Sequence, residues 1–301
     1  MPAGKPWTKP GVRRNRSRVV RWVRLLRTRR PVTFTEKVRY KMLRDHRALQ
    51  VVFADKAAMR AHVTQLVGAG HLPELVALLD DPAGLKDLDL PDAYVVKPTH
   101  GSGACVVVSP SAMAQARLPP AEHGWVYAHV RAADPARLAA IAEVWCSTTY
   151  GRGPNHEWAY GQVRPRVLVE ELLRGPDGLP PADHKLFVVH GRCRFVQVDE
   201  GRFGSHTQDF FDRDWTPLDL VGGRPRAQQP PARPAALDEM LELAERLGAG
   251  TDFVRVDLFV LPGRVLVGEL TSSPAGGDSP FDPPHWDAVF GEHWQVPRRY
   301  R

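Results

Sequence analysis

The chain has 301 residues, of which 43% are hydrophobic and 25% are charged, and this composition is typical of a globular protein with two or three packed subdomains. No apolar run approaches the roughly 20 residues that span a bilayer, and the basic N-terminus lacks the apolar segment of a signal peptide. The three cysteines, Cys105, Cys146 and Cys193, lie far apart, which argues against a zinc site or a disulfide framework. We therefore expect reduced thiols and a cytoplasmic protein.

The net charge of +7 comes from an N-terminal arm, residues 1–30. This arm contains eleven Lys or Arg and no acidic residue. Val19, Trp22, Val23 and Leu26 within it share one face at helical spacing. A solvated helix packed on the body, a helix docked on an anionic membrane surface, and a segment that binds RNA or another polyanion all fit this pattern. No stable nucleic-acid complex is predicted.

Residues 31–90 are expected to be mostly helical. Thr33 or Thr35 can cap a helix that ends near His46. A second helix begins near Asp55-Lys56, and the apolar stretch 72–79 predicts a third.

After residue 90 the pattern changes to short β-branched runs around turns. Two Pro-rich stretches, 174–182 and 224–234, predict surface loops. Hairpins with helices between them favour an α+β fold with antiparallel sheets over a doubly wound parallel sheet. The expected strands are 93–97, 104–108, 167–170, 185–189, 193–198, 253–260 and 265–270, and the expected helices are 134–147 and 237–247.

The last hairpin carries the strongest chemical signal. Arg255 and Asp257 share one face of its first strand, and Glu269 and Thr271 share a face of its second. Acidic residues in an apolar strand are costly to bury without a cation, and two facing carboxylates raise each other's pKa. A Mg²⁺ ion relieves that repulsion. An ion pair between Arg255 and Glu269, with Asp257 solvated, is the alternative.

Three further places carry polar groups that suit a nucleotide. Lys97 precedes the flexible turn Pro98-Thr-His-Gly-Ser-Gly103, whose backbone N–H groups can cradle phosphates. Val169-Glu-Glu-Leu172 ends a strand with two acids, and Asp183-His-Lys185 opens the next strand. Asp55-Lys56 with Arg60 has, on its own, the pattern of a surface ion-pair cluster.

Taken in order, these segments resemble the ATP-grasp superfamily and, more closely, its TupA-like branch, over about residues 31–294. That resemblance implies an α+β ATP-grasp fold, in which two α+β subdomains hold ATP between antiparallel sheets behind a helical N-terminal region. The implied divisions are 31–90, 91–170 for the small subdomain and 171–301 for the large subdomain with its metal site. The matching segments are Pro31–Lys37, Ala54–Lys56 with Arg60, Val96–Gly103, Val169–Leu173, Asp183–Lys185, Asp209–Trp215, Phe253–Phe259 and Gly268–Gly277.

The resemblance also implies roles for single residues. Lys97 and Lys185 would contact the ATP phosphates under the mobile loop Gly101-Ser102-Gly103. Glu170 would meet the adenine edge and Leu172 its plane, while Glu171 or Asp183 would bind ribose. One or two Mg²⁺ ions would lie on Asp257 and Glu269. Many ATP-grasp enzymes have Asn where Thr271 stands, and Arg255 would sit where an acyl phosphate forms.

The implied activity is an ATP- and Mg²⁺-dependent carboxylate–amine ligase that forms an amide through an acyl phosphate. Its substrates would be an amino acid, a peptide or a sugar-acid polymer precursor, as in cell-surface polymer or natural-product biosynthesis. A phosphotransferase acting on a hydroxyl and a non-catalytic nucleotide-binding partner of a polysaccharide assembly system are the alternatives. Candidate substrate contacts are Arg152, His156, Tyr160, His206 and Asp209.

Overall fold

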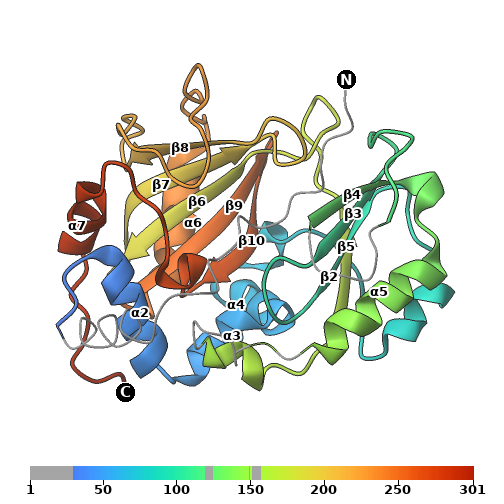
Figure 1. Ribbon diagram of the computed structural model, residues 1–301, viewed down its shortest axis with the longest axis horizontal. Helices are drawn as coiled ribbons and strands as arrows, with labels where there is room; N and C mark the ends of the chain where they lie inside the picture. The colour runs from blue at the N-terminus through green and yellow to red at the C-terminus, as the bar shows by residue number, and fades with distance from the viewer. Residues whose placement is uncertain (1–29, 119–124, 149, 151–156) are drawn as a thin grey trace, which may run out of the picture.

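Two five-stranded sheets lie side by side, with helices packed against them (Figure 1). The computed structural model describes residues 30–118, 125–148, 150 and 157–301. The helices are α2 (Phe34–Arg44), α3 (Ala48–Ala54), α4 (Lys56–Val67), α5 (Pro135–Ser147), α6 (Leu237–Gly248) and α7 (His285–Glu292). The strands are β1 (Leu75–Leu79), β2 (Tyr94–Pro98), β3 (Cys105–Ser109), β4 (Trp125–His129), β5 (Val167–Glu171), β6 (Asp183–Val189), β7 (Arg192–Glu200), β8 (Thr207–Asp212), β9 (Phe253–Leu261) and β10 (Arg264–Thr271).

The first sheet has the strand order β1-β5-β2-β3-β4. Its pairs are antiparallel except β3 with β4, which is parallel. Helix α5 packs its apolar stripe on one face, where Trp145 and Ile141 join Val96, Val106 and Val169 in a buried cluster. Residues on the alternate positions of these strands therefore face the second sheet.

The second sheet is antiparallel throughout, in the order β10-β9-β6-β7-β8. One face is apolar and packs on α4 and α6, with Leu186, Val188, Val254 and Val256 in its core. The opposite face is divided in two. Near α2 and α7 it is aromatic, and Phe34 packs edge-on against three of its rings, namely Phe187, Phe195 and Phe253.

The remaining part of that face is charged. Because strand side chains alternate, the positions that continue the aromatic rows of β6 and β9 also point away from the apolar core. These positions hold Asp183 and Lys185 on β6, and Arg255 and Asp257 on β9. One strand face therefore passes from an aromatic anchor to a charged surface that is turned toward the first sheet.

The expected α+β class, with two sheets and N-terminal helices, is confirmed. Thr33, one of the two expected caps, caps α2 in a reciprocal capping box with Glu36. Helix α4 begins at Lys56, where a helix was expected to begin, and Asp55 caps it.

The helix expected over 72–79 is wrong, because residues 75–79 form strand β1, paired with β5. A short apolar run fits either structure, and the open edge of β5 decides the outcome. Strands β4 and β8 were not predicted.

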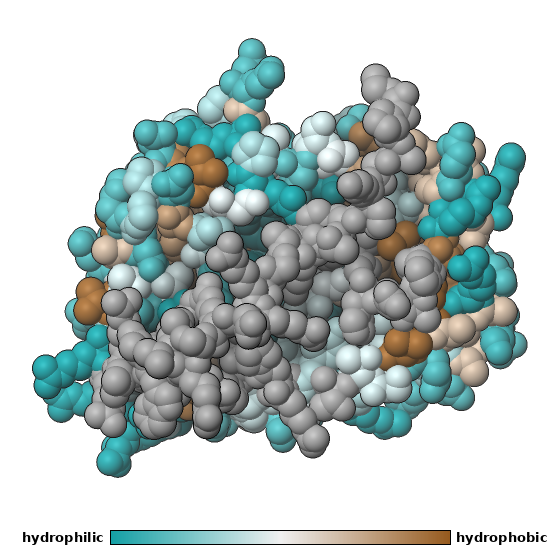
Figure 2. Space-filling view, in the orientation of Figure 1, coloured by the Kyte–Doolittle hydropathy of each residue, from teal (hydrophilic) through white to brown (hydrophobic). Residues whose placement is uncertain are grey.

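The basic arm, residues 1–30, lies outside the described residues except for Arg30. Among the described helices, none combines the length and apolar character needed to cross a membrane. Figure 2 shows largely hydrophilic residues along the upper rim of the molecule, with hydrophobic residues in small separate groups. Most large apolar side chains are therefore in the buried clusters described above.

Candidate functional site

The hairpin of β9 and β10 places its acids directly opposite each other. Asp257 pairs in register with Glu269, and Arg255 pairs with Thr271. The Arg255 guanidinium contacts both acidic residues. Its Nε and Nη2 donate to the two oxygens of Asp257 at 2.6 Å each. The same Nη2 donates to Thr271 Oγ1 at 3.2 Å and lies 3.7 Å from Glu269 Oε2. A bulge at Gly268 brings this register about.

Burial controls the electrostatics of this hairpin. It raises the pKa of Asp257 to about 6, against the opposing pull of Arg255 and Lys185. Burial alone would lower the pKa of Arg255, but Asp257 and Glu269 outweigh it and raise that pKa. The expected alternative of an Arg255–Glu269 pair is thus partly realised. Asp257, however, is buried and takes the shorter contacts.

Lys185 of β6 stands next to this hairpin within a group of carboxylates. Its Nζ donates to Asp183, lies 3.0 Å from Asp199 Oδ2 and lies 3.8 Å from Asp257 Oδ2. Arg202 Nη2 donates to Asp183 Oδ2 at 2.5 Å. Asp199 of β7 was missed in the sequence analysis. Its signal was present, since Gln197 and Asp199 alternate with buried valines along β7.

The first sheet contributes a second charged group. Lys97 Nζ on β2 donates to Glu170 on β5, and Arg60 Nη1 of α4 lies 3.4 Å from the other oxygen of Glu170. Lys56, the first residue of α4, donates from its Nζ to the carbonyl oxygen of Gly101 at 3.0 Å. The prediction of a surface ion-pair cluster at Asp55, Lys56 and Arg60 is wrong, because Asp55 is buried and the other two side chains line the space between the sheets.

The turn after Lys97 is held in a conformation that requires glycine. Gly101 and Gly103 have φ values of +73° and +84°. A Cβ on Gly101 would lie 2.6 Å from the Tyr150 ring, so any side chain there would collide with it. Ser102, between the two glycines, is exposed. The loop is therefore shaped by its glycines, its bond to Lys56 and the Tyr150 ring.

The two candidates for ribose, Glu171 and Asp183, lie in different environments. Glu171 sits at the rim, where its carboxylate accepts from the backbone N–H of Glu74 and from Arg264. Asp183 is buried beside Lys185.

Leu172 belongs to a small apolar cluster on the inner face of the first sheet, with Cys105 and Val107. Phe203, from the β7–β8 turn of the second sheet, joins this cluster by stacking on Tyr127, with ring centroids 4.8 Å apart. The cluster therefore links the two sheets on the inner side.

A narrow hollow lies between the charged group of the first sheet and Val267 and Gly268 of β10 in the second sheet. The pKa of Lys56 is lowered by burial and by Lys97, while Glu269 of the other sheet opposes this change, so Lys56 lies within electrostatic range of both groups. The lining residues are Lys56, Met59, Arg60, Lys97, Leu168, Glu170, Val267 and Gly268.

Two in-register carboxylates supply the oxygen ligands that Mg²⁺ takes in proteins. Their space is filled by the Arg255 guanidinium, and Thr271 Oγ1 accepts from it. Among the residues that the structure describes, no group of three or more His, Cys, Asp or Glu could hold a metal. The donor set therefore fits Mg²⁺ only if phosphate oxygens and water complete the shell and Arg255 turns aside.

The candidate substrate contacts separate in the structure. Tyr160 is near the β9–β10 hairpin, and burial, together with Glu269, raises the pKa of Tyr160 well above the usual value. His206 Nε2 lies 3.2 Å from Asp199 Oδ1. Asp209 is buried on the other face of the sheet, where it accepts from the backbone N–H of Ala227. Arg152 and His156 lie outside the described residues.

Proteins of known structure or family resemble this chain. Solved structures with a similar fold include D-alanine–D-alanine ligase from Helicobacter pylori, at 16% identity over 82% of this chain and 62% of its own, with a TM-score of 0.46. An L-amino acid ligase from Bacillus licheniformis has 14% identity over 75% of this chain and 44% of its own length, with a TM-score of 0.40. The ATP-grasp ligase PsnB, complexed with minimal precursor, Mg and ADP, has 13% identity over 75% of this chain and 52% of its own length, with a TM-score of 0.38.

The chain spans less than two thirds of the length of each of these structures. A search of curated proteins gave no match. Residues 151–295 match the family described as TupA-like ATPgrasp. This span contains β6, which carries Lys185, and β9, which carries Arg255. Residues 151–295 of this chain are therefore a TupA-like ATP-grasp domain.

Proposed function

We propose that this chain is an ATP- and Mg²⁺-dependent carboxylate–amine ligase. The observation that carries the proposal is the pair of charged sheet faces that are turned toward each other. Lys56 and Lys97 lie on one side, and Lys185 and Arg255 stand beside paired carboxylates on the other. Lys97, Lys185 and Arg255 each pair with a carboxylate in the structure. A triphosphate with Mg²⁺ supplies both an anion for these cations and a cation for their carboxylate partners.

The nucleotide would lie between the sheets. Lys97 and Lys185 would bind its phosphates under the Gly101–Gly103 loop, whose N–H groups and bound Lys56 add positive potential. Asp183, which faces inward, suits the ribose hydroxyls better than Glu171 at the rim.

Adenine would rest on the apolar cluster of the first sheet that contains Leu172. Glu170 would accept from the amino group of the base while it also holds Lys97. The edge and the plane of the base are thus assigned to Glu170 and Leu172, the two residues that the family resemblance implied.

Asp257 and Glu269 would hold Mg²⁺ through their carboxylate oxygens, with Thr271 beside them. Bound there, the ion would neutralise charge on the phosphoryl oxygens. Arg255 would then be released from Asp257 and could direct its fixed fork of donors at the transferred phosphoryl group.

The reaction proceeds in two displacements. A substrate carboxylate oxygen attacks the γ-phosphorus, the bond to the β–γ bridging oxygen breaks, and ADP leaves with that electron pair. An amine nitrogen then attacks the acyl carbon, the carbon–oxygen bond to phosphate breaks, and the nitrogen loses a proton. The chain contributes positioning and charge neutralisation through Lys97, Lys185 and Arg255.

ADP release from Mg²⁺-ATP tests the proposal, with pooled carboxylates (amino acids, sugar acids) and pooled amines (amino acids, dipeptides) supplied singly and together. We expect release only with both pools and a product with the mass of an amide rather than a phosphate ester. Glu269→Gln and Lys97→Ala should lose it, while Glu239→Gln on the exposed side of α6 and Lys86→Ala should not. ATP turnover unaffected by Glu269→Gln would overturn the metal assignment.

A further inference from the structure

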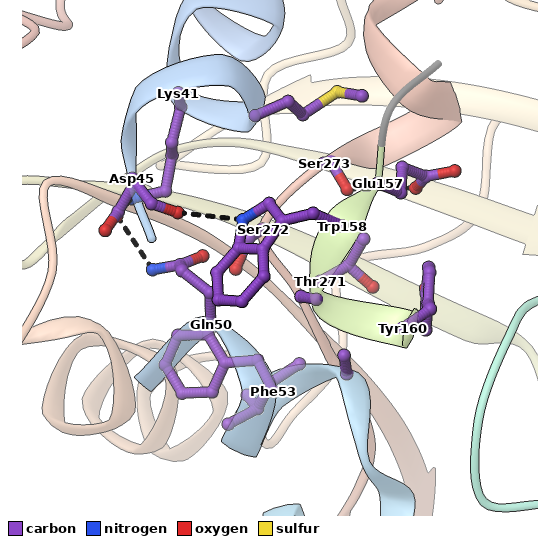
Figure 3. Close-up of a pocket in the computed structure, with 14 residues that line it drawn as sticks. Lys41, Asp45, Gln50, Phe53, Glu157, Trp158, Tyr160, Thr271, Ser272 and Ser273 are labelled. Atoms are coloured by element: carbon purple, nitrogen blue, oxygen red, sulfur yellow. Dashed lines mark hydrogen bonds and ion pairs between the residues drawn. The ribbon is translucent and has the colours of Figure 1, made fainter. Parts of the chain in front are cut away.

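The two ends of strand β10 differ in the space that they leave for a ligand. At its last residue, Thr271, a hollow of about 440 Å³ remains (Figure 3). The strand begins beside Glu171 of the first sheet. There the apolar cluster that contains Leu172 is packed by Phe203, from the turn of residues 201–206 between β7 and β8. The proposed nucleoside end of the site is therefore occupied by a side chain of the protein itself.

Phe203 lies on the surface that we assign to adenine. It packs against the cluster of Cys105, Val107 and Leu172. Its ring stacks on that of Tyr127 of β4, with centroids 4.8 Å apart and planes inclined by 25°. Adenine is a flat aromatic ring and would use the same apolar surface by stacking. The base and the Phe203 ring in its present position therefore compete for one surface.

Arg202, the residue before Phe203, contacts the carboxylate that we assign to ribose. Its Nη2 donates to Asp183 Oδ2 at 2.5 Å and lies 4.0 Å from Asp199 Oδ2. Asp183 is 8% exposed, and among the residues that the structure describes no donor reaches its Oδ1. A buried acceptor without a donor is uncommon, and a ribose hydroxyl would supply one. Two adjacent residues of one turn therefore lie at the positions proposed for the base and the sugar.

The turn is held together by bonds within itself. The N–H of Gly204 donates to the carbonyl oxygen of Gly201 at 2.8 Å, and the N–H of His206 donates to that of Gly204 at 3.1 Å. Gly201 has a φ of +61°, and a Cβ there would lie 2.6 Å from the carbonyl oxygen of Ser205. The turn can therefore swing about the ends of β7 and β8 as a unit, and it then withdraws Arg202 and Phe203 together.

We propose that Arg202 and Phe203 are a built-in competitor of the nucleoside part of ATP, and that they set the affinity for ATP. The inference deepens the proposed ligase function and rests on it for the identity of the ligand. Without nucleotide, Phe203 covers the adenine surface and Arg202 holds the ribose carboxylate. When ATP binds, the base replaces the Phe203 ring and the ribose hydroxyls donate to Asp183. The withdrawal of the turn reduces the apparent affinity for the nucleoside but not for the phosphates.

Three probes separate the two ends of the nucleotide. Adenosine carries the base and the sugar, inorganic tripolyphosphate carries the phosphates, and a non-hydrolysable ATP analogue carries both. Each is titrated calorimetrically into the full chain with Mg²⁺. In Phe203→Ala the stack on Tyr127 no longer has to be broken, so adenosine and the analogue should each bind about threefold to tenfold more tightly than in the wild type. Tripolyphosphate should bind equally to both proteins.

Matched variants show whether the effect belongs to these side chains. Ser205→Ala, an exposed position in the same turn, should bind all three probes as the wild type does. Arg202→Gln, which frees Asp183 Oδ2, should tighten adenosine at least about twofold. If Phe203→Ala fails to fold, Phe203→Leu keeps an apolar side chain without the ring stack and should still tighten the analogue at least about twofold.

The outcomes distinguish this inference from the ligase function. If the wild type binds the analogue and its affinity is unchanged or weaker in Phe203→Ala, the competition fails and the proposed function stands. If the analogue does not bind to the wild type but adenosine binds to Phe203→Ala, the proposed function fails and the competition stands. If tripolyphosphate binding rises as much as that of the analogue, the effect is not confined to the nucleoside end and the competition fails.

Discussion

Replacement of Arg255 by methionine tests whether a cation is required between Asp257 and Glu269. Arg255 forms two hydrogen bonds of 2.6 Å to Asp257, and the side chains of the two residues are only 13% and 6% exposed. Loss of one partner from a buried, hydrogen-bonded charge pair costs about 3–5 kcal/mol of unfolding free energy. For a chain of this size that corresponds to a fall in Tm of about 6–10 °C.

Mg²⁺ should restore part of the loss. In the wild type the ion competes with Arg255 for the carboxylates, whereas in Arg255→Met it meets two carboxylates without that competitor. At 10 mM Mg²⁺ a site with a Kd of about 1 mM gains about 1.4 kcal/mol. We therefore expect Mg²⁺ alone to stabilise Arg255→Met more than the wild type.

Urea unfolding at pH 7.5, with EDTA or with 10 mM MgCl₂, measures both effects. Arg264→Met on the same hairpin is the matched control, because Arg264 is 47% exposed and its pair with Glu171 is worth less than about 1 kcal/mol. An Arg255→Met free energy within about 0.5 kcal/mol of wild type would refute the need for a cation. Equal Mg²⁺ stabilisation of both proteins would refute the idea that the ion takes the place of Arg255.

Three further variants test other parts of the structure. Gly101→Ala should weaken ATP-analogue binding at least about tenfold in a calorimetric titration, because its φ of +73° and the Tyr150 ring leave no room for Cβ; unchanged affinity would contradict a phosphate-loop role. Asp199→Asn should raise the KM for ATP several-fold, because Lys185 loses a partner 3.0 Å away; an unchanged KM for ATP would contradict a phosphate-binding role of Lys185. Burial lowers the pKa of His184 below its unfolded value of about 6.5, so its stabilising contribution is complete above that pH and is lost as the pH falls. His184→Phe should therefore show a shallower loss of unfolding free energy from pH 7 to 5 by urea titration, and an unchanged slope would contradict this.

Local signals in the sequence were sufficient for much of the fold. Thr33 with Glu36, and Asp55 before an apolar helix, mark helix starts that the structure confirms. Turn residues fixed the hairpins, as at His190-Gly191, where both residues have positive φ. These features depend on neighbours within a few residues, so they can be read without knowledge of tertiary contacts.

Other features depend on partners that are distant in the sequence. Residues 75–79 become a strand only because β5, almost 100 residues later, leaves an edge for them. Lys56 resembled a solvated surface lysine until α4 was placed between the sheets, where its Nζ reaches Gly101. Asp199 gave only a weak alternation signal, and its meaning depends on Lys185 of the adjacent strand.

The charged half of the second sheet also explains why this site can be maintained within a stable domain. Lys185, Asp199 and Asp257 share a strand face with the aromatic cluster of Phe187 and Phe253, and the same strands bury valines and leucines on their other face. Buried ionic groups often contribute less stability than apolar residues of similar volume would. The aromatic half and the apolar core offset that cost, and the strands are held rigidly enough to fix the charges in place. A face that was selected for stability alone would have continued the aromatic row to its end. The charges therefore favour the proposed ligand, because their mixed sign suits one that brings both phosphate and a metal ion.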